Sequence, residues 1–199
     1  MDDSRSDAEL IDASLQRPAE FGLVFERHWD TVFQFFERRL GPDPAPDLAS
    51  EVFRIAFERR TSYETGDGIS CLPWLYGIAA NLALKEHRRF SRHLAAIGRY
   101  ARFRVADGDD HATEVAASVD SEDLWSQLQP GLKALDEMSR EMLLLVAWEG
   151  LSYQQVADVF GIPLGTVRSR LHRARTRLRT LLNAPIGPVI DTAIRERGK

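Results

Sequence analysis

Residues 151–182 hold two helical patterns joined by a glycine, and this arrangement restricts the fold more than any other feature of the chain. Ser152 and Gln155 have the spacing of a capping box, so a helix is expected to begin at Ser152. Gly161 is the residue type that commonly follows a helix, and Pro163 favours the first turn of a new one. In that second helix an apolar stripe is formed by Val167, Leu171, Ala174 and Leu178. Two helices joined by a short turn predict a helix-turn-helix.

The second helix of this motif is basic, although the chain has a formal net charge of -4 at pH 7. Arginines recur along it, and no acidic residue occurs between Leu164 and Asn183. Because salt screens exposed charges beyond about 10 Å, a ligand responds to this local patch and not to the net charge. The basic helix predicts insertion into a DNA major groove, and a solvated arginine-rich face is the alternative.

Different residues of this helix are expected to contact DNA phosphates and DNA base edges. Gly165, Thr166 and Ser169 are small and lie near its N-terminus, where the backbone can approach a phosphate and the helix dipole favours an anion. Candidates for contacts with base edges or phosphates are Thr166, Arg168 and Arg170. Candidates for phosphate contacts alone are Arg173, Arg175 and Arg177.

Helical periodicity also dominates the rest of the chain, and no alternating strand pattern interrupts it, which predicts an all-α protein. Residues 105–123 are small and acidic without apolar periodicity, so we expect a flexible linker between two small helical domains. Helices are expected at 21–40, 47–60, 72–92, 124–135, 139–149, 152–160 and 164–182. The expected organisation is an N-terminal tail 1–19, a first domain 20–95, a linker 96–123, a helix-turn-helix domain 124–183 and a C-terminal tail 184–199.

The composition argues against several other classes of protein. Cys71 is the only cysteine, and the five histidines show no metal-ligand spacing, so we expect neither a disulfide nor a metal site. Gly-rich phosphate loops and recognisable catalytic arrangements are missing from the sequence, which predicts a protein that is not an enzyme and needs no cofactor. Without an apolar run near 18 residues or a signal-peptide pattern, we expect a cytoplasmic protein that does not insert into a membrane.

The predicted helix 72–92 carries a polar, mostly basic row. Asn81, Lys85, Arg88 and Arg92 recur on one face, and Trp74 extends the row towards the N-terminus. Sites for single-stranded DNA combine aromatic rings, on which bases stack, with cations that follow the backbone. This row is therefore a candidate site for single-stranded DNA. Packing in the core is the alternative role for the aromatic residues of this segment, Trp74 and Tyr76.

Three motifs occur in order along the chain: DLASEVFRIAF at 47–57, PWLYGIAANLALKEHRR at 73–89 and GTVRSRLHRAR at 165–175. In this order they resemble the extracytoplasmic-function (ECF) group of bacterial RNA polymerase sigma factors, over about residues 20–183. Two positions depart from the family pattern: Ser50, where glutamine is frequent, and Ala80, where arginine is common.

The resemblance implies a division of labour in promoter recognition. The helix-turn-helix is expected to bind the minus-thirty-five element, and the first domain to bind the minus-ten element. In the first domain, a base flipped from the non-template strand is implied to enter a pocket lined by the loop 63–70 and by Asn81. The implied minus-ten residues are Tyr63, Asp67, Ser70, Trp74, Asn81, Lys85, Arg88, Arg89 and Arg92.

The resemblance also implies protein partners. Core RNA polymerase is the first, bound through the clamp helices of its largest subunit and through its flap, and an anti-sigma factor is the second. The implied clamp-binding residues on the helix 47–60 are Asp47, Ser50, Glu51 and Arg54, with a solvated face as the alternative. The apolar stripe expected on the same helix is formed by Leu48, Val52, Ile55 and Ala56. The acidic linker is implied to lie near the polymerase catalytic channel.

A stand-alone helix-turn-helix regulator is the competing function. It would explain residues 124–182 but would leave the segment 73–89 and the acidic linker without a role. A free sigma factor of this group is expected to bind promoter DNA weakly without polymerase, so a gel shift without polymerase separates the two functions.

Overall fold

The computed structural model describes residues 5–64, 70–101 and 131–182, with the side chains of 90–101 and 181–182 excepted. Every regular element in these ranges is helical, which confirms the all-α prediction for the described part of the chain. The chain forms two compact units, residues 1–115 and 116–199, as expected for two helical domains. The predicted linker 105–123 and most of the predicted helix 124–135 lie outside the described residues.

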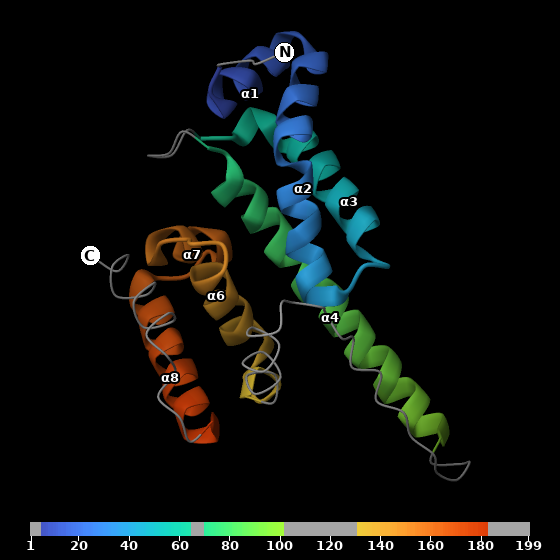
Figure 1. Ribbon diagram of the computed structural model, residues 1–199, viewed down its shortest axis with the longest axis vertical. Helices are drawn as coiled ribbons and strands as arrows, with labels where there is room; N and C mark the ends of the chain where they lie inside the picture. The colour runs from blue at the N-terminus through green and yellow to red at the C-terminus, as the bar shows by residue number, and fades with distance from the viewer. Residues whose placement is uncertain (1–4, 65–69, 102–130, 183–199) are drawn as a thin grey trace, which may run out of the picture. The chain divides into compact units, whose positions relative to one another are not determined.

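Figure 1 shows the helices of each unit. The first unit contains α1 (Asp7–Gln16), η1 (Pro18–Glu20), α2 (Phe21–Leu40), α3 (Ala45–Arg59), η2 (Arg60–Ser62) and α4 (Leu72–Ala101). The second contains α6 (Glu137–Ala147), α7 (Tyr153–Phe160) and α8 (Leu164–Leu182). The helix α4 continues past residue 95, so the first residues assigned to the linker extend this helix.

The core of the first unit lies where α2, α3 and the N-terminal half of α4 pack together (Figure 1). Its fully buried side chains include Val24, Val32, Phe35, Phe36, Val52 and Leu75. Tyr76 belongs to this core as well, because its ring stacks on Phe35 with 5.6 Å between centroids. The alternative of core packing is therefore correct for Tyr76.

The helix α3 differs from the prediction in its start and in its buried face. It begins at Ala45, since Pro46 is compatible with the first turn of a helix. Of the predicted apolar stripe, Val52 and Ala56 are buried, and Leu48 and Ile55 at its edge are partly exposed. The buried face instead turns towards Phe53, whose ring lies 4.9 Å from that of Phe25 on α2.

The residues assigned to an N-terminal tail include the capped helix α1. Ser6 caps it, and the Glu9 side chain returns to the Ser6 backbone, which forms a capping box. Leu10 and Ile11 are buried, so apolar packing joins α1 to the rest of its unit.

The second unit confirms the local signals of the helix-turn-helix. Ser152 and Gln155 form the expected capping box, and Gly161 has a left-handed φ of 60°. The expected stripe of α8 is buried throughout: Val167, Leu171, Ala174 and Leu178. The preceding helix α6 starts two residues before its predicted position, because Asp136 accepts a hydrogen bond from the Ser139 backbone N–H at 3.0 Å and caps it.

Candidate functional site

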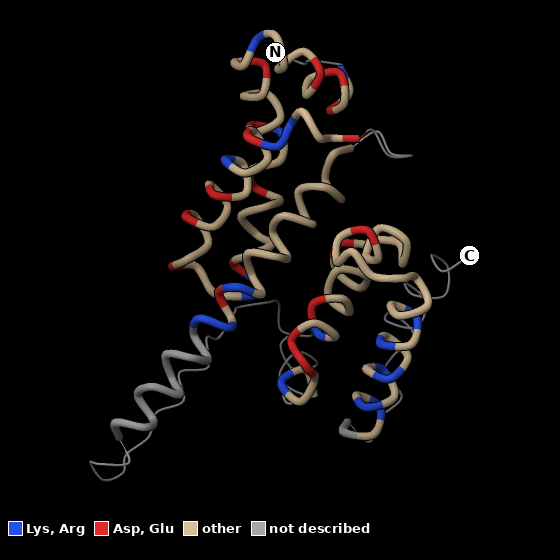
Figure 2. Tube along the Cα trace, turned by 180° about the vertical axis from the view of Figure 1, so that it is seen from behind, with Lys and Arg blue, Asp and Glu red and all other residues tan. Residues whose placement is uncertain are grey.

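Basic residues recur along α8 from Arg168 to Arg179 with no acidic residue among them, as Figure 2 shows. Arg168, Arg173 and Arg177 are exposed there, opposite the buried stripe. Gly165 is exposed at the N-terminal end, and a Cβ atom added to it would meet no heavy atom within 4 Å. The helix therefore offers an open, positively charged surface that starts at a helix N-terminus, which is the arrangement that binds nucleic-acid phosphates.

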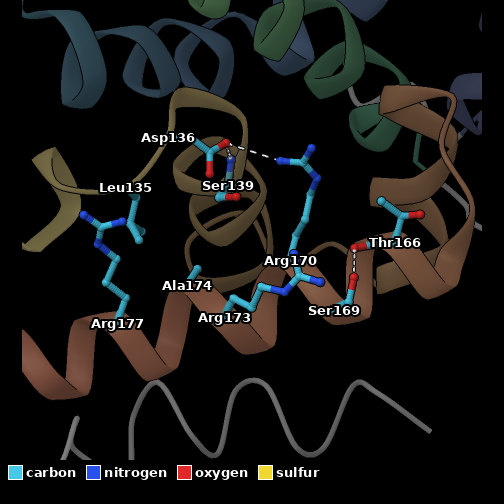
Figure 3. A pocket seen from close by; sticks show the side chains of 9 residues that line it. All are labelled: Leu135, Asp136, Ser139, Thr166, Ser169, Arg170, Arg173, Ala174 and Arg177. Atoms are coloured by element: carbon cyan, nitrogen blue, oxygen red, sulfur yellow. Dashed lines mark hydrogen bonds and ion pairs between the residues drawn. The ribbon is translucent and has the colours of Figure 1, made fainter.

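A groove of about 440 Å³ lies between this helix and the start of α6 (Figure 3). Its walls carry Leu135, Asp136, Ser139, Thr166, Ser169, Arg170, Arg173, Ala174 and Arg177. Most of the predicted residues of α8 thus come together around one hollow. The Ser169 hydroxyl donates to the Thr166 carbonyl at 3.0 Å, which fixes its orientation in the first turns of the helix.

Asp136 places a carboxylate in this otherwise basic groove. Arg170 Nη1 lies 3.4 Å from Asp136 Oδ1, the oxygen that also caps α6 (Figure 3). Burial acts to raise the pKa of Asp136, but hydrogen bonds from Ser139 and the charge of Arg170 lower it below its ordinary value. The carboxylate is therefore ionised at neutral pH and offsets part of the positive charge of Arg170. Asp136 is not among the residues predicted from the sequence, where its only signal is its position as the cap of α6.

Arg175 lies differently from the other arginines of α8. Its Nη2 donates to the Tyr153 hydroxyl at 2.7 Å, and its guanidinium lies 5.8 Å from the centre of that ring. The sequence predicts a phosphate contact for Arg175, whereas its observed contacts join α8 to α7.

The first unit brings an aromatic pair to the start of α4. The rings of Tyr63 and Trp74 lie 5.0 Å apart at an interplanar angle of 54°, and both are partly exposed. Burial raises the pKa of Tyr63, with smaller contributions from Cys71 and Asp7. Trp74 is thus only partly buried, and its ring contacts that of Tyr63.

The polar row of α4 is exposed as far as its side chains are described. Asn81 donates from Nδ2 to the Gly77 carbonyl at 2.8 Å, and Lys85, Arg88 and Arg89 are exposed. Ser70 accepts a hydrogen bond from the Leu72 N–H at 3.2 Å at the start of the helix. Among the predicted residues, Asp67 and the side chain of Arg92 lie outside the described part.

The outer face of α3 carries the candidate polymerase-binding residues. Asp47 and Ser50 are exposed, and Ser50 donates to the Pro46 carbonyl at 2.9 Å. Arg54 pairs with Glu51 at 2.6 Å and with Glu58 at 2.5 Å. The hydrogen bond from Arg54 lowers the pKa of Glu51, and the two carboxylates raise that of Arg54. This face therefore presents an ordered group of mixed charge.

Comparison with known proteins decides the family. The family described as Sigma-70 region 2 matches residues 24–93, and Sigma-70, region 4 matches residues 127–178. The RNA polymerase sigma factor CarQ of Myxococcus xanthus is 33% identical over 165 residues, which cover 81% of this chain and 88% of CarQ. The ECF RNA polymerase sigma factor EcfG of Rhodopseudomonas palustris is 30% identical over 142 residues, 70% of this chain and 72% of EcfG. The chain belongs to the ECF RNA polymerase sigma factors.

Solved structures share the fold of this sigma factor. Sigma factor RpoE, in complex with the anti-sigma factor NepR from Bartonella quintana, aligns with a TM-score of 0.57 at 23% identity, covering 83% of this chain and 98% of that one. CnrH, in complex with the cytosolic domain of CnrY, aligns with a TM-score of 0.58 at 21% identity, covering 89% and 97%. Among the described helices of this sigma factor, none has the length and apolar character of a membrane span.

The first unit of the sigma factor also holds a buried polar cluster that was not predicted from the sequence. Asp7 is 2% exposed, and its Oδ2 accepts from the Cys71 backbone N–H at 2.8 Å and lies 2.7 Å from His28 Nε2. Its Oδ1 accepts from Arg27 at 2.5 Å. Burial acts to raise the pKa of Asp7, but the hydrogen bonds from Cys71, Arg27 and His28 lower it to about 2. An ionised carboxylate only accepts hydrogen bonds, so His28 is a donor here.

The side chains of Asp7, His28 and Cys71 are three potential metal ligands whose ligand atoms lie within 4.8 Å of one another. Two ligands about 2.1 Å from a tetrahedral zinc ion would lie roughly 3.4 Å apart. Asp7 Oδ2 and His28 Nε2 are closer, at 2.7 Å, which is a hydrogen-bond distance. Burial also raises the pKa of the Cys71 thiol, which disfavours the thiolate that metals bind. The cluster is organised as a hydrogen-bond network around Asp7.

Proposed function

We propose that this sigma factor binds the minus-thirty-five element through α8. The observation that supports this proposal most is the exposed arginine face of that helix. Gly165, Thr166 and Ser169 would let the N-terminal end of the helix approach a phosphate, and Arg168 would reach base edges in the major groove. Arg170 would contact base edges or phosphates. The exposed Arg173 and Arg177 would contact phosphates alone.

Region 2 would capture the non-template strand of the minus-ten element. Support comes from the partly exposed Tyr63–Trp74 pair and from the exposed Asn81, Lys85, Arg88 and Arg89 on α4. Stacking contributes about 1–3 kcal/mol per base, and the cations would follow the strand. Asp67, Ser70 and Arg92 join this proposal on the strength of the sequence motif.

Core RNA polymerase would bind the outer face of α3, where its largest subunit would offer the clamp helices. Asp47, Ser50, Glu51 and Arg54 are the proposed contact residues. Because Arg54 is already held by Glu51 and Glu58, its guanidinium would meet the partner in a fixed orientation. Region 4 would contact the polymerase flap.

An anti-sigma factor would control access to polymerase. Two structural relatives were solved with partners, RpoE with the anti-sigma factor NepR and CnrH with the cytosolic domain of CnrY. We place the protein in the cytoplasm, as a transcription factor that is not an enzyme. Within it, residues 20–95 and 124–183 would act as the two promoter-binding domains.

In vitro transcription with purified core polymerase tests the function. The protein should direct initiation from a matching promoter, whereas core polymerase alone should not. A stand-alone regulator would instead bind promoter duplex tightly without polymerase and would not associate with the core enzyme. That combination, with a folded protein, would overturn the proposal.

A further inference from the structure

The helix α1 lies outside the segment matched by the region 2 family, which begins at residue 24. It nevertheless contacts η2, the short helix immediately before Tyr63. Through Asp7 it also binds the backbone of Cys71, the residue immediately before α4. These two contacts flank the loop 63–70, which is the proposed minus-ten loop. The helix α1 therefore contacts the chain immediately before and immediately after this loop.

The charge of Asp7 suits its place at the start of α4. A helix N-terminus leaves backbone N–H groups without intrahelical acceptors and carries a partial positive charge. Asp7 supplies a buried carboxylate acceptor next to this end, although it belongs to a helix 64 residues earlier in the chain. His28 and Arg27 of α2 hold the same carboxylate in place.

We propose that Asp7 is a positioning residue for single-strand capture, acting through the Cys71 N–H on the start of α4 and thereby on Tyr63 and Trp74. The proposal rests on the proposed minus-ten function of region 2. Asp7 itself is buried and does not touch DNA. Its carboxylate fixes the first turn of α4, and Trp74 lies in that turn. Loss of the carboxylate frees this turn and separates the aromatic pair.

The test uses holoenzyme formed from the full chain and core polymerase, with a single-stranded minus-ten oligonucleotide as the probe. Asp7→Ala should weaken binding of the oligonucleotide roughly tenfold, because it removes hydrogen bonds to a charged group. Asp7→Asn keeps an acceptor and the side-chain size, so it should recover part of the affinity. Asp12→Ala is the matched control, since Asp12 is an exposed acidic residue of the same helix, and it should bind as the unchanged protein does.

A second measurement separates positioning from general destabilisation. Hydrogen exchange in Asp7→Ala should accelerate in peptides covering 63–75, while core association and minus-thirty-five duplex binding stay unchanged. Uniform acceleration across α2 and α3 with loss of core association would overturn the proposal. If Asp7→Ala does not fold, Asp7→Asn carries the test, with a loss of roughly threefold expected for a weakened hydrogen bond.

Two further outcomes keep this proposal distinct from the proposed function. If the unchanged holoenzyme fails to bind the oligonucleotide, the minus-ten function of region 2 is wrong, and the role of Asp7 falls with it. If the unchanged holoenzyme binds and the folded Asp7 variants bind equally well, only the role of Asp7 is wrong.

Discussion

Arg175 Nη2 donates a hydrogen bond to the Tyr153 hydroxyl at 2.7 Å and so joins the second helix of the helix-turn-helix to the first. This contact gives Arg175 a structural role among arginines that otherwise lie on the exposed face of α8. Replacing it should therefore affect the stability of region 4, whereas replacing an exposed neighbour should affect DNA binding.

The first prediction compares Arg175→Ala with Arg173→Ala. Arg175→Ala should lower the free energy of unfolding of region 4 by about 1–2 kcal/mol, through the lost hydrogen bond and ring contact. Arg173 is exposed, so Arg173→Ala should leave stability nearly unchanged. The difference in stability is measured by denaturant unfolding of the full chain and, separately, by hydrogen exchange of α7 and α8 in the folded protein. Equal stabilities of the two variants would contradict the structural role of Arg175.

The second prediction concerns how α8 reads DNA. Arg168→Ala should weaken binding of holoenzyme to a minus-thirty-five duplex by about 1–3 kcal/mol if the side chain contacts a base bidentately, and should relax sequence preference. Arg173→Ala should lower the salt slope of binding by about one unit and keep the preference. Affinities for matched and substituted duplexes over a salt series distinguish the two. A uniform loss for Arg168→Ala across all sequences would reassign it to phosphate contacts.

The third prediction separates the two DNA sites. Asn81→Ala should leave minus-thirty-five duplex binding unchanged and impair open-complex formation, because Asn81 lies exposed on the face proposed to capture an unpaired base. Permanganate footprinting of thymines near the start site reports melting by the holoenzyme. The proposed division between the two DNA sites is incorrect if Asn81→Ala abolishes duplex affinity instead.

The fourth prediction concerns the acidic residue in the basic groove. Asp136→Ser removes the charge that pairs with Arg170 but keeps a good cap for α6, so stability should change by less than about 0.5 kcal/mol. Affinity for unrelated duplex should rise and its salt slope should steepen, because Arg170 is released to bind phosphate. Asp136→Ala loses the cap as well and should cost about 1 kcal/mol of stability. Unaltered duplex binding by both variants would mean that Asp136 serves α6 alone.

The fifth prediction concerns pH. The pKa of Asp7 is about 2 in the folded protein against an ordinary value of 3.8, so its ionised form stabilises the fold. This contribution, about 2 kcal/mol, is present above pH 4 or so and is lost as the pH falls towards about 2. The difference in unfolding free energy between the unchanged protein and Asp7→Asn should therefore be smaller at about pH 3 than at about pH 5. A constant difference between them would contradict the low pKa.

Local signals in the sequence were enough to predict the helix-turn-helix. The capping box at Ser152, the left-handed Gly161 and the buried stripe of α8 each depend on residues within a few positions of one another. The family could be predicted for the same reason, since its motifs are short and occur in order along the chain, and the matches to both sigma-70 regions confirm it. The individual DNA and polymerase contacts stay predictions.

Contacts between distant parts of the chain could not be predicted in this way. The buried face of α3 turns towards Phe53 because rings on α2 pack against it, and the periodicity of α3 carries no information about those rings. Asp7 and Cys71 are 64 residues apart, and neither has a neighbour that indicates the other. The capping box of α1 was a readable signal that the assignment of a tail overlooked.

The separation of Asp7 from Cys71 also sets an order of events during synthesis. The carboxylate leaves the ribosome first, and its backbone partner follows 64 residues later. At about 5–20 residues per second this interval lasts roughly 3–13 s. Until it ends, the Asp7 carboxylate lacks the Cys71 N–H, although α1 can already pack against η1 and α2. The hydrogen bond that joins α1 to the start of α4 can therefore form only after Cys71 has emerged.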